Sequence, residues 1–125
     1  MSSNAERSTS GPLSDVRVLE LGTLIAGPFA GRIFADFGAE VVKVEHPERG
    51  DPLRNWGMTW NGTDSLWHLV QARGKRSVAA DLGDPDDLAL VRQLALESDV
   101  LVENFRPGRL ERWGLDPEEL MDLNP

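Results

Sequence analysis

Short apolar runs and longer segments with helical spacing alternate along the chain. The apolar runs are rich in Val and Leu and are bounded by turn residues, which predicts buried strands. We expect these strands near residues 16–22, 40–45, 77–81 and 99–104. Short strands joined through helices form right-handed parallel crossovers. The pattern therefore predicts an α/β fold, a Rossmann-like open parallel sheet flanked by helices.

Capping residues and apolar spacing predict the helices. The first begins at Pro28, whose missing N–H costs nothing in a first turn, and it ends at Gly38. Its expected apolar face consists of Phe29, Ile33, Phe34 and Phe37.

Four later helical segments follow from the same signals. A short helix over residues 65–73 (SLWHLVQAR) can be capped by Asp64 or Thr63. Short helical pieces are also expected over residues 106–115 and 116–123. Between residues 73 and 106, Asp84 caps a longer helix, whose apolar face is formed by Leu88, Val91, Leu94 and Ala95.

The turn after the first strand (GTLIAGP) leaves several interpretations open. Its glycines at 22, 27 and 31 fit neither the G-x-G-x-x-G dinucleotide fingerprint nor a P-loop. Glu45, which ends the second strand, is placed to hold a ribose, although a cap or an ion pair is the simpler role. The alternative for Gly27 and Gly31 is that they only let the helix lie close to the sheet. Spacing alone favours that alternative and leaves nicotinamide or another nucleotide-like ligand open.

Composition indicates one soluble, metal-independent domain. The chain has 125 residues, 40% hydrophobic and 27% charged, and no apolar run long enough to span a bilayer. Residues 1–12 are rich in Ser and Gly and lack the apolar core of a signal peptide, which predicts a flexible arm. With no cysteine and two histidines, neither a disulfide framework nor a multi-histidine metal site is expected. We expect a cytoplasmic protein.

The net charge of −8 is concentrated late in the chain. Residues 1–80 carry nine acidic and nine basic side chains, whereas residues 81–125 carry twelve acidic and four basic ones. This balance argues against nucleic acid as a partner but permits a small anion, which needs only a local group of donors. Two such groups are present. The first is Arg73, Lys75 and Arg76, and the second is Arg106, Arg109 and Arg112. For both groups the alternative is ordinary surface charge, and the second group would then pair with Glu103 and Glu111.

Several blocks, in order, resemble one known family. They are "LSDVRVLELGTLIAGPFAGRIFADFGAEVVKVEHPERGD", "NGTDSLWHLVQARGKRSVAADL" and "SDVLVENFRPGRLERWGLDPEELMDLNP". Together they are similar to the N-terminal part of the class III CoA-transferases, a family that includes formyl-CoA:oxalate and carnitine CoA-transferases and α-methylacyl-CoA racemases. The resemblance covers residues 13–125, which would form the CoA-binding first part of a larger Rossmann-like domain.

The resemblance implies transfer of CoA between carboxylic acids, with acyl-CoA and a carboxylic acid as substrates and an interlocked homodimer as the complete protein. Acyl-CoA racemisation, or a non-catalytic nucleotide-binding module, are the alternatives. The family's nucleophilic aspartate would lie beyond Pro125, so no catalytic residue is expected within residues 1–125. The chain alone is therefore expected to be inactive and, with an uncovered sheet edge, prone to aggregate or dimerise.

The resemblance also assigns ten residues to CoA. They are Ile25 and Ala26 beside the CoA chain, Asp81, Leu82, Gly83 and Asp84 at the adenosine end, Asn104, Phe105 and Arg106 at the nucleotide, and Arg112 at a phosphate. Formyl-CoA transferases carry glutamine at position 25, so the isoleucine here argues against the oxalate and formate pair. Some members place an arginine where this chain has Pro47, and Arg49 is a candidate substitute.

Overall fold

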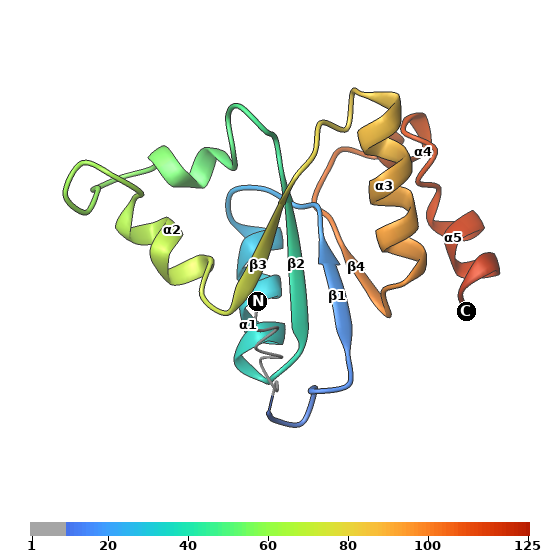
Figure 1. Ribbon diagram of the computed structural model, residues 1–125, viewed down its shortest axis with the longest axis horizontal. Helices are drawn as coiled ribbons and strands as arrows, with labels where there is room; N and C mark the ends of the chain where they lie inside the picture. Colours follow the sequence, from blue (N-terminus) through green and yellow to red (C-terminus); the bar gives the residue numbers. More distant parts are fainter. Residues whose placement is uncertain (1–9) are drawn as a thin grey trace, which may run out of the picture.

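The computed structural model describes residues 10–125 and shows a four-stranded parallel sheet with helices on both faces (Figure 1). The strand order is β3-β2-β1-β4. The strands are β1 (Arg17–Glu20), β2 (Glu40–Glu45), β3 (Lys75–Ala79) and β4 (Val100–Val102). The predicted α/β class and parallel pairing are confirmed. The third strand begins two residues earlier than predicted, because Lys75 pairs in register with Val41 directly after the turn at Gly74.

Helices connect the strands and follow the last one. They are α1 (Ala26–Asp36), the 3-10 helix η1 (Pro52–Asn55), α2 (Leu66–Gln71), α3 (Pro85–Leu96), α4 (Arg109–Arg112) and α5 (Pro117–Leu123). Within residues 10–125, no helix has both the length and the apolar character needed to cross a membrane.

The two faces of the sheet carry different cores. Alternate residues of a strand point to opposite faces. Val18 of β1 packs with Ala39 and Val41 on the side of α1. Leu19 packs on the other side, in the cluster that includes Val91 of α3. The chain therefore crosses one face through α1 and the other through α3, and strand order reverses between β1 and β4.

Helix α1 lies on the sheet through its small residues. Gly27, Pro28 and Gly31 are buried, and a Cβ at position 31 would lie 2.0 Å from Oε2 of Glu20 in β1. The prediction that the large apolar residues form the buried face was wrong for three of the four, since Phe29, Ile33 and Phe37 are 45%, 39% and 52% exposed. Phe34 is partly buried against the cluster of Val18. The close contact at Gly31 orients the helix and turns its bulky side chains outward.

The caps were predicted with mixed success. Asp84 caps α3 as expected, because its Oδ1 accepts from the N–H groups of Asp86 and Asp87 at 2.9 and 3.1 Å. The cap of α2 is Ser65, not Asp64 or Thr63, since its Oγ accepts from the N–H of His68 at 2.9 Å. Asp64 instead pairs with Arg54.

The expected apolar face of α3 is confirmed by its contacts with the core under that helix. It consists of Leu88, Val91, Leu94 and Ala95.

Residues 1–9 of the expected N-terminal arm lie outside the described residues. Gly11 sits against the end of α1, where a Cβ would come within 2.6 Å of the carbonyl oxygen of Phe37. The N–H of Leu13 donates to the same oxygen at 3.0 Å. The described part of the chain therefore begins in contact with the fold.

For the stability of a Gly31→Ala variant, the contact under α1 and helix propensity predict opposite changes. At an open helical position, Gly→Ala stabilises by about 1 kcal/mol. Gly31→Ala should instead destabilise by roughly 1–3 kcal/mol, because the added carbon overlaps the Glu20 carboxylate. Urea unfolding measures the difference. Gly83→Ala, whose Cβ would come no closer than 3.2 Å to Asp81, is the control, and a stabilised Gly31→Ala protein would refute the packing argument.

Candidate functional site

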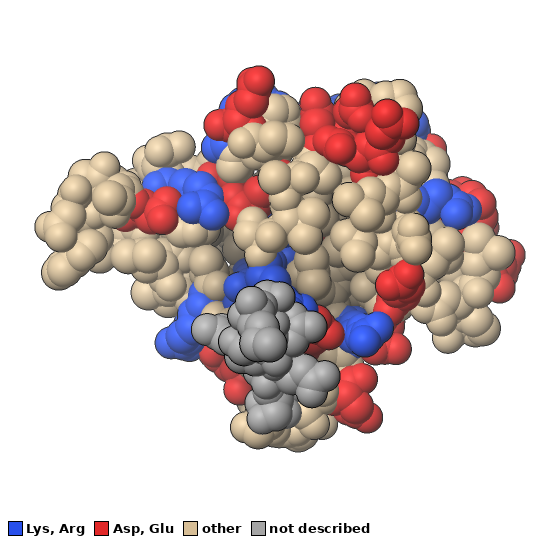
Figure 2. Space-filling model, in the orientation of Figure 1, with Lys and Arg blue, Asp and Glu red and all other residues tan. Residues whose placement is uncertain are grey.

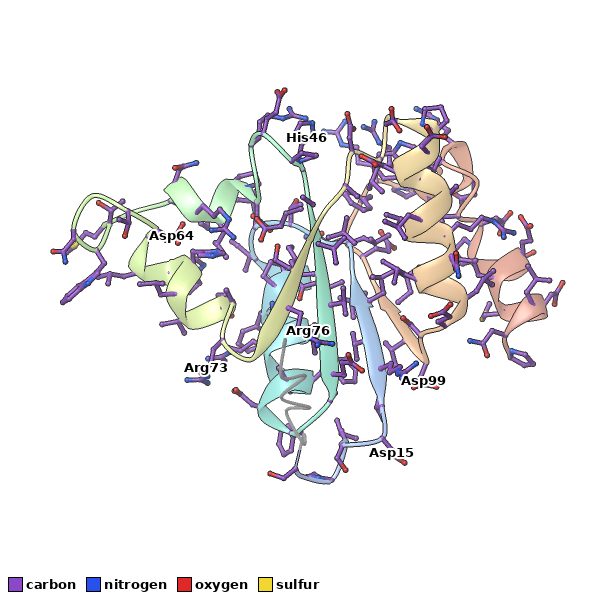
Figure 3. The ribbon with its side chains drawn as sticks, viewed as in Figure 1. Asp15, His46, Asp64, Arg73, Arg76 and Asp99 are labelled. Carbon is purple, nitrogen blue, oxygen red and sulfur yellow. The ribbon has the colours of Figure 1, made fainter. Side chains whose placement is uncertain are left out.

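A cleft opens where the carboxyl ends of the strands meet. Its volume is about 400 Å³, within the range of small-molecule sites. His46 lies at this end of the sheet, opposite Asp15 and Asp99 (Figure 3). Open α/β sheets bind ligands at this edge, where strand order reverses. The lining includes Thr23, His46, Arg49, Asp51, Asp81, Leu82, Gly83, Phe105, Arg109 and Trp113.

The β1–α1 turn, residues 21–25, forms one wall of the cleft. The N–H of Thr23 donates to Oδ1 of Asn104 at 2.8 Å, and the Asn104 amide donates back to the carbonyl of Thr23 at 2.9 Å. The N–H of Gly22 bonds to the carbonyl of Val102, and that of Leu24 bonds to Asp51. These three N–H groups are thus satisfied by protein atoms. A pyrophosphate cradled by the turn, as in a dinucleotide site, has no support here.

Buried charges lie beneath the turn. Glu20 and Lys43 face each other on neighbouring strands, with Nζ of Lys43 3.0 Å from Oε1 of Glu20. The same ammonium lies 2.8 Å from Asp51 and also donates to the carbonyl of Gly22. Lys75 approaches Oε2 of Glu20 at 2.7 Å. Burial lowers the pKa of Lys75, although Glu20 opposes the shift. We call Glu20, Lys43, Asp51 and Lys75 the buried charge cluster.

Glu45 is held by protein groups. Both carboxylate oxygens accept from Arg54, at 2.7 and 3.0 Å, and the N–H of Asp51 and the hydroxyl of Ser77 add bonds at 2.8 and 3.1 Å. Burial raises the pKa of Glu45, but these hydrogen bonds outweigh it and lower the pKa from 4.5 to about 2. The ion-pair interpretation of Glu45 is confirmed. With its acceptors occupied, a ribose contact is not supported.

An aromatic pair and an arginine form the opposite wall. The rings of Phe105 and Trp113 meet edge to face with centroids 5.1 Å apart. The guanidinium of Arg109 stacks over Trp113, 4.7 Å from the ring centroid. This wall therefore offers aromatic ring surface beside a positive charge.

Four arginines around the strand ends form no ion pair with any of the residues 10–125. Arg49 follows β2, and the other three, Arg106, Arg109 and Arg112, follow β4. The expected alternative, pairing to Glu103 and Glu111, is not observed. Oε2 of Glu103 instead accepts from the N–H of Phe105 at 2.8 Å. Elsewhere, ion pairs hold Arg17, Arg54, Arg73, Arg76 and Arg92.

The other basic group, at residues 73–76, does not form a site. Arg73 pairs with Asp36 at 2.8 Å and Arg76 with Glu40 at 2.7 Å, both at exposed positions. The alternative interpretation as surface charge is confirmed for Arg76. It is wrong for Lys75, whose side chain is only 4% exposed because it turns inward to Glu20.

The tryptophans divide between two surfaces. Trp113 lines the cleft, whereas Trp56, Trp60 and Trp67 are 46–60% exposed in this chain. The last three belong to the apolar lobe of η1 and α2, whose outer end carries few charged side chains (Figure 2).

Four of the ten residues predicted to bind CoA line the cleft, namely Asp81, Leu82, Gly83 and Phe105. Ile25 stands at the N-terminal boundary of α1, 51% exposed and next to Ala26. Asp84 is occupied as a helix cap, and Asn104 as the partner of Thr23. Arg106 and Arg112 are exposed near the cleft without lining it. The assignment of all ten to CoA stays a prediction.

Sequence reasoning did not assign several of the lining residues to the site, His46 and Asp51 among them. His46 directly follows the strand-ending Glu45, and that position alone marks it for the ligand edge of the sheet. Its Nδ1 accepts from the N–H of Glu48 at 3.2 Å, and its Nε2 lies 3.7 Å from Asp81. Asp51 precedes Pro52, which indicates a helix cap but not a binding site, and its bond to the N–H of Leu24 joins residues 27 positions apart. Among residues 10–125, no group of three or more His, Asp or Glu side chains is arranged to hold a metal ion.

Comparison with known proteins adds to this geometry. The sequence pattern that defines CoA-transferase family III matches residues 13–125, which is most of the chain. The chain belongs to this family. The resemblance of the three sequence blocks is thereby confirmed.

Several known proteins are similar to this chain in sequence and in structure. The chain is 56% identical to succinyl-CoA–D-citramalate CoA-transferase of Chloroflexus aurantiacus, over 91% of this chain and 28% of that protein. It is 47% identical to succinate–glutarate CoA-transferase of Agrobacterium fabrum, over 91% of this chain and 30% of that protein. A crystal structure of a CAIB/BAIF family protein from Brucella suis superposes on this chain with a TM-score of 0.83 at 42% sequence identity. The superposition covers 92% of this chain and 31% of that protein. The chain thus spans less than a third of each of these proteins.

In this family member, the Glu45–Arg54 pair gives a pH-dependent prediction. Because the pKa of Glu45 is lowered on folding, the ionised carboxylate stabilises the fold above about pH 4.5, and this contribution is lost as pH falls towards 2. Glu45→Gln should therefore cost on the order of 3 kcal/mol at pH 7, with the cost shrinking between pH 4.5 and 2.

Denaturant unfolding across that pH range measures the difference between the two proteins. Glu48→Gln is the control, since Glu48 is exposed and makes no ion pair within the described residues, so its difference should stay near zero throughout. A Glu45→Gln cost that is the same at pH 7 and pH 2.5 would show that the ionised pair does not stabilise the fold.

Proposed function

We propose that the protein transfers CoA between carboxylic acids and that this chain binds the nucleotide end of CoA in the strand-end cleft. The observation that carries the proposal is the combination of an aromatic wall with arginines that form no ion pair within residues 10–125, at the point where strand order reverses. Family membership supports it, since the relatives named above are CoA-transferases.

The arginines suit the phosphates of CoA, which carries a pyrophosphate and a 3′-phosphate. Arg49 and Arg109 line the cleft from opposite loops, and Arg106 and Arg112 flank it. A guanidinium forms bidentate, charge-assisted bonds to phosphate, and these four are not already neutralised by carboxylates of the described chain. Of the three acidic residues that line the cleft, Glu45 and Asp51 are paired with Arg54 and Lys43, and Asp81 lies 3.7 Å from His46. The arginines therefore offer local attraction for an anion despite the acidic chain.

The aromatic wall suits adenine. Phe105 and Trp113 present apolar ring surface, and Arg109 adds a cation beside it. We place the adenosine against Asp81, Leu82, Gly83 and Asp84, with Asn104 close by. The pantetheine chain would then run past the β1–α1 turn to Ile25 and Ala26, where α1 begins without a side-chain cap.

The complete reaction requires more than these 125 residues. We propose that the nucleophilic carboxylate lies outside them and that the complete protein is an interlocked cytoplasmic homodimer. The relatives named for succinyl-CoA, citramalate and glutarate support a short dicarboxylic acid and its CoA ester as substrates. The same names favour CoA transfer over acyl-CoA racemisation.

The arginines provide the test of CoA binding. Arg109→Ala and Arg112→Ala should each weaken CoA binding about tenfold to a hundredfold, because each removes a charge-assisted phosphate contact of roughly 1.5–3 kcal/mol. Lysine at either position should recover only part of the loss, since it lacks the planar fork. Isothermal titration with CoA measures all four variants.

Arg92→Ala is the control, because Arg92 pairs with Glu119 on α5 and does not line the cleft. Its affinity for CoA should stay within about twofold of the unaltered protein. Dephospho-CoA should bind more weakly than CoA. Equal, small effects at positions 92, 109 and 112, or NAD binding as tight as CoA binding, would reject the assignment of this cleft to CoA.

A further inference from the structure

We propose that Asp51 is a positioning residue that fixes the two loops forming one side of the strand-end cleft. It would set the shape of the cleft that the bound CoA meets, so its effect on affinity rests on the proposed function. The shape itself does not depend on which ligand binds.

Asp51 joins segments that are distant in the sequence. It is 2% exposed, and its Oδ1 accepts from the N–H of Leu24 at 3.2 Å and from the N–H of Leu53 at 2.8 Å. Its Oδ2 pairs with Lys43 at 2.8 Å. Its own N–H donates to Glu45 at 2.8 Å. One carboxylate thus ties the β1–α1 turn to η1 and to the strand between them.

The turn needs this support because its backbone is in an unfavourable conformation. Leu24 has a φ of 64°, in the left-handed region that residues other than glycine rarely adopt. Such a conformation persists only where surrounding contacts hold it. Asn104 binds both backbone groups of Thr23 on one side of the turn, and Asp51 binds the N–H of Leu24 on the other. The strained residue is therefore held on both sides.

Lys43 fixes the position of Asp51 in turn. Its ammonium is divided between Asp51, Glu20 and the carbonyl of Gly22, and the side chain is 8% exposed. A second cation, Lys75, completes the compensation of Glu20 and donates to the carbonyl of Pro28 at 2.8 Å in the first turn of α1. The cluster therefore connects the turn with the start of the helix that follows it. A shift of Asp51 would leave the buried ammonium of Lys43 without one of its three partners.

The consequence for the cleft follows from what these loops carry. Thr23 lines the cleft from the turn, while Arg49 and Gly50 line it from the loop before Asp51. If Asp51 releases the turn, Thr23 moves relative to Arg49 and to the aromatic wall. Misplacement of binding groups by about 1 Å is enough to cost a large factor in a positioned site.

Asp51→Ser is the informative variant. Serine retains a side-chain cap for η1 but cannot reach both Leu24 and Lys43. Amide hydrogen exchange by NMR should show the Leu24 N–H exchanging at least tenfold faster than in the unaltered protein, with the N–H of Val91 unchanged. Titration should show CoA binding weakened about tenfold.

Val41→Ala controls for lost stability, because it opens the small core on the α1 face of the sheet, which contains no residue that lines the cleft. In this variant the affinity for CoA should stay within about twofold of that of the unaltered protein. The N–H of Leu24 should exchange no faster than the other backbone N–H groups of the β1–α1 turn. A merely structural role for Asp51 would make the two variants behave alike, and that outcome would overturn the proposal.

The unaltered protein gives an independent test in case Asp51→Ser does not fold. Its Leu24 amide should exchange at least a hundredfold more slowly than a free peptide amide, as expected for a bond to a buried carboxylate. Exchange at the free rate would refute the positioning role. Failure of the unaltered protein to bind CoA would reject the proposed function alone, since the exchange measurements would still decide whether Asp51 holds the turn.

Discussion

The ion pair between Glu20 and Lys43, at the centre of the sheet, is the constraint on which much of this structure depends. Two charges at neighbouring register positions on adjacent strands are both removed from water, which costs several kcal/mol per ion unless partners surround them. Lys75 from the edge strand and Asp51 from the following loop supply those partners. The requirement for full compensation thereby fixes the start of β3 and the position of the loop after β2.

The same carboxylate explains the unusual orientation of α1. Glu20 rises from the sheet directly beneath Gly31, so only a residue without a Cβ fits there. The helix consequently contacts the sheet through glycine and proline, and Phe29, Ile33 and Phe37 face outward. At this helix, the pairing of the buried Glu20 carboxylate with cations takes precedence over burial of the largest apolar side chains.

Internal pairing also reconciles an acidic chain with an anionic ligand. The carboxylates under the cleft are neutralised by lysines and by Arg54, whereas the arginines after β2 and β4 are left without carboxylate partners within residues 10–125. The surplus acid gathers elsewhere, notably over the beginning of α3 (Figure 2), where it stabilises the helix N-terminus. Local distribution of charge, more than net charge, sets what the cleft attracts.

By itself the sequence determined the α/β class, the parallel direction of the strands, the Asp84 cap and the family, because these follow from short-range spacing and from blocks of matching residues. It also placed Asp81, Leu82, Gly83 and Phe105 at the strand ends, where they line the cleft. The tertiary structure alone decided which charges are buried, since Glu20, Lys43 and Lys75 meet across three strands. It decided which face of α1 is covered, because helical spacing groups the phenylalanines but does not say that a carboxylate occupies the sheet below. It likewise assigned Asp51 and Asn104 to the turn, through hydrogen bonds between residues 27 and 81 positions apart.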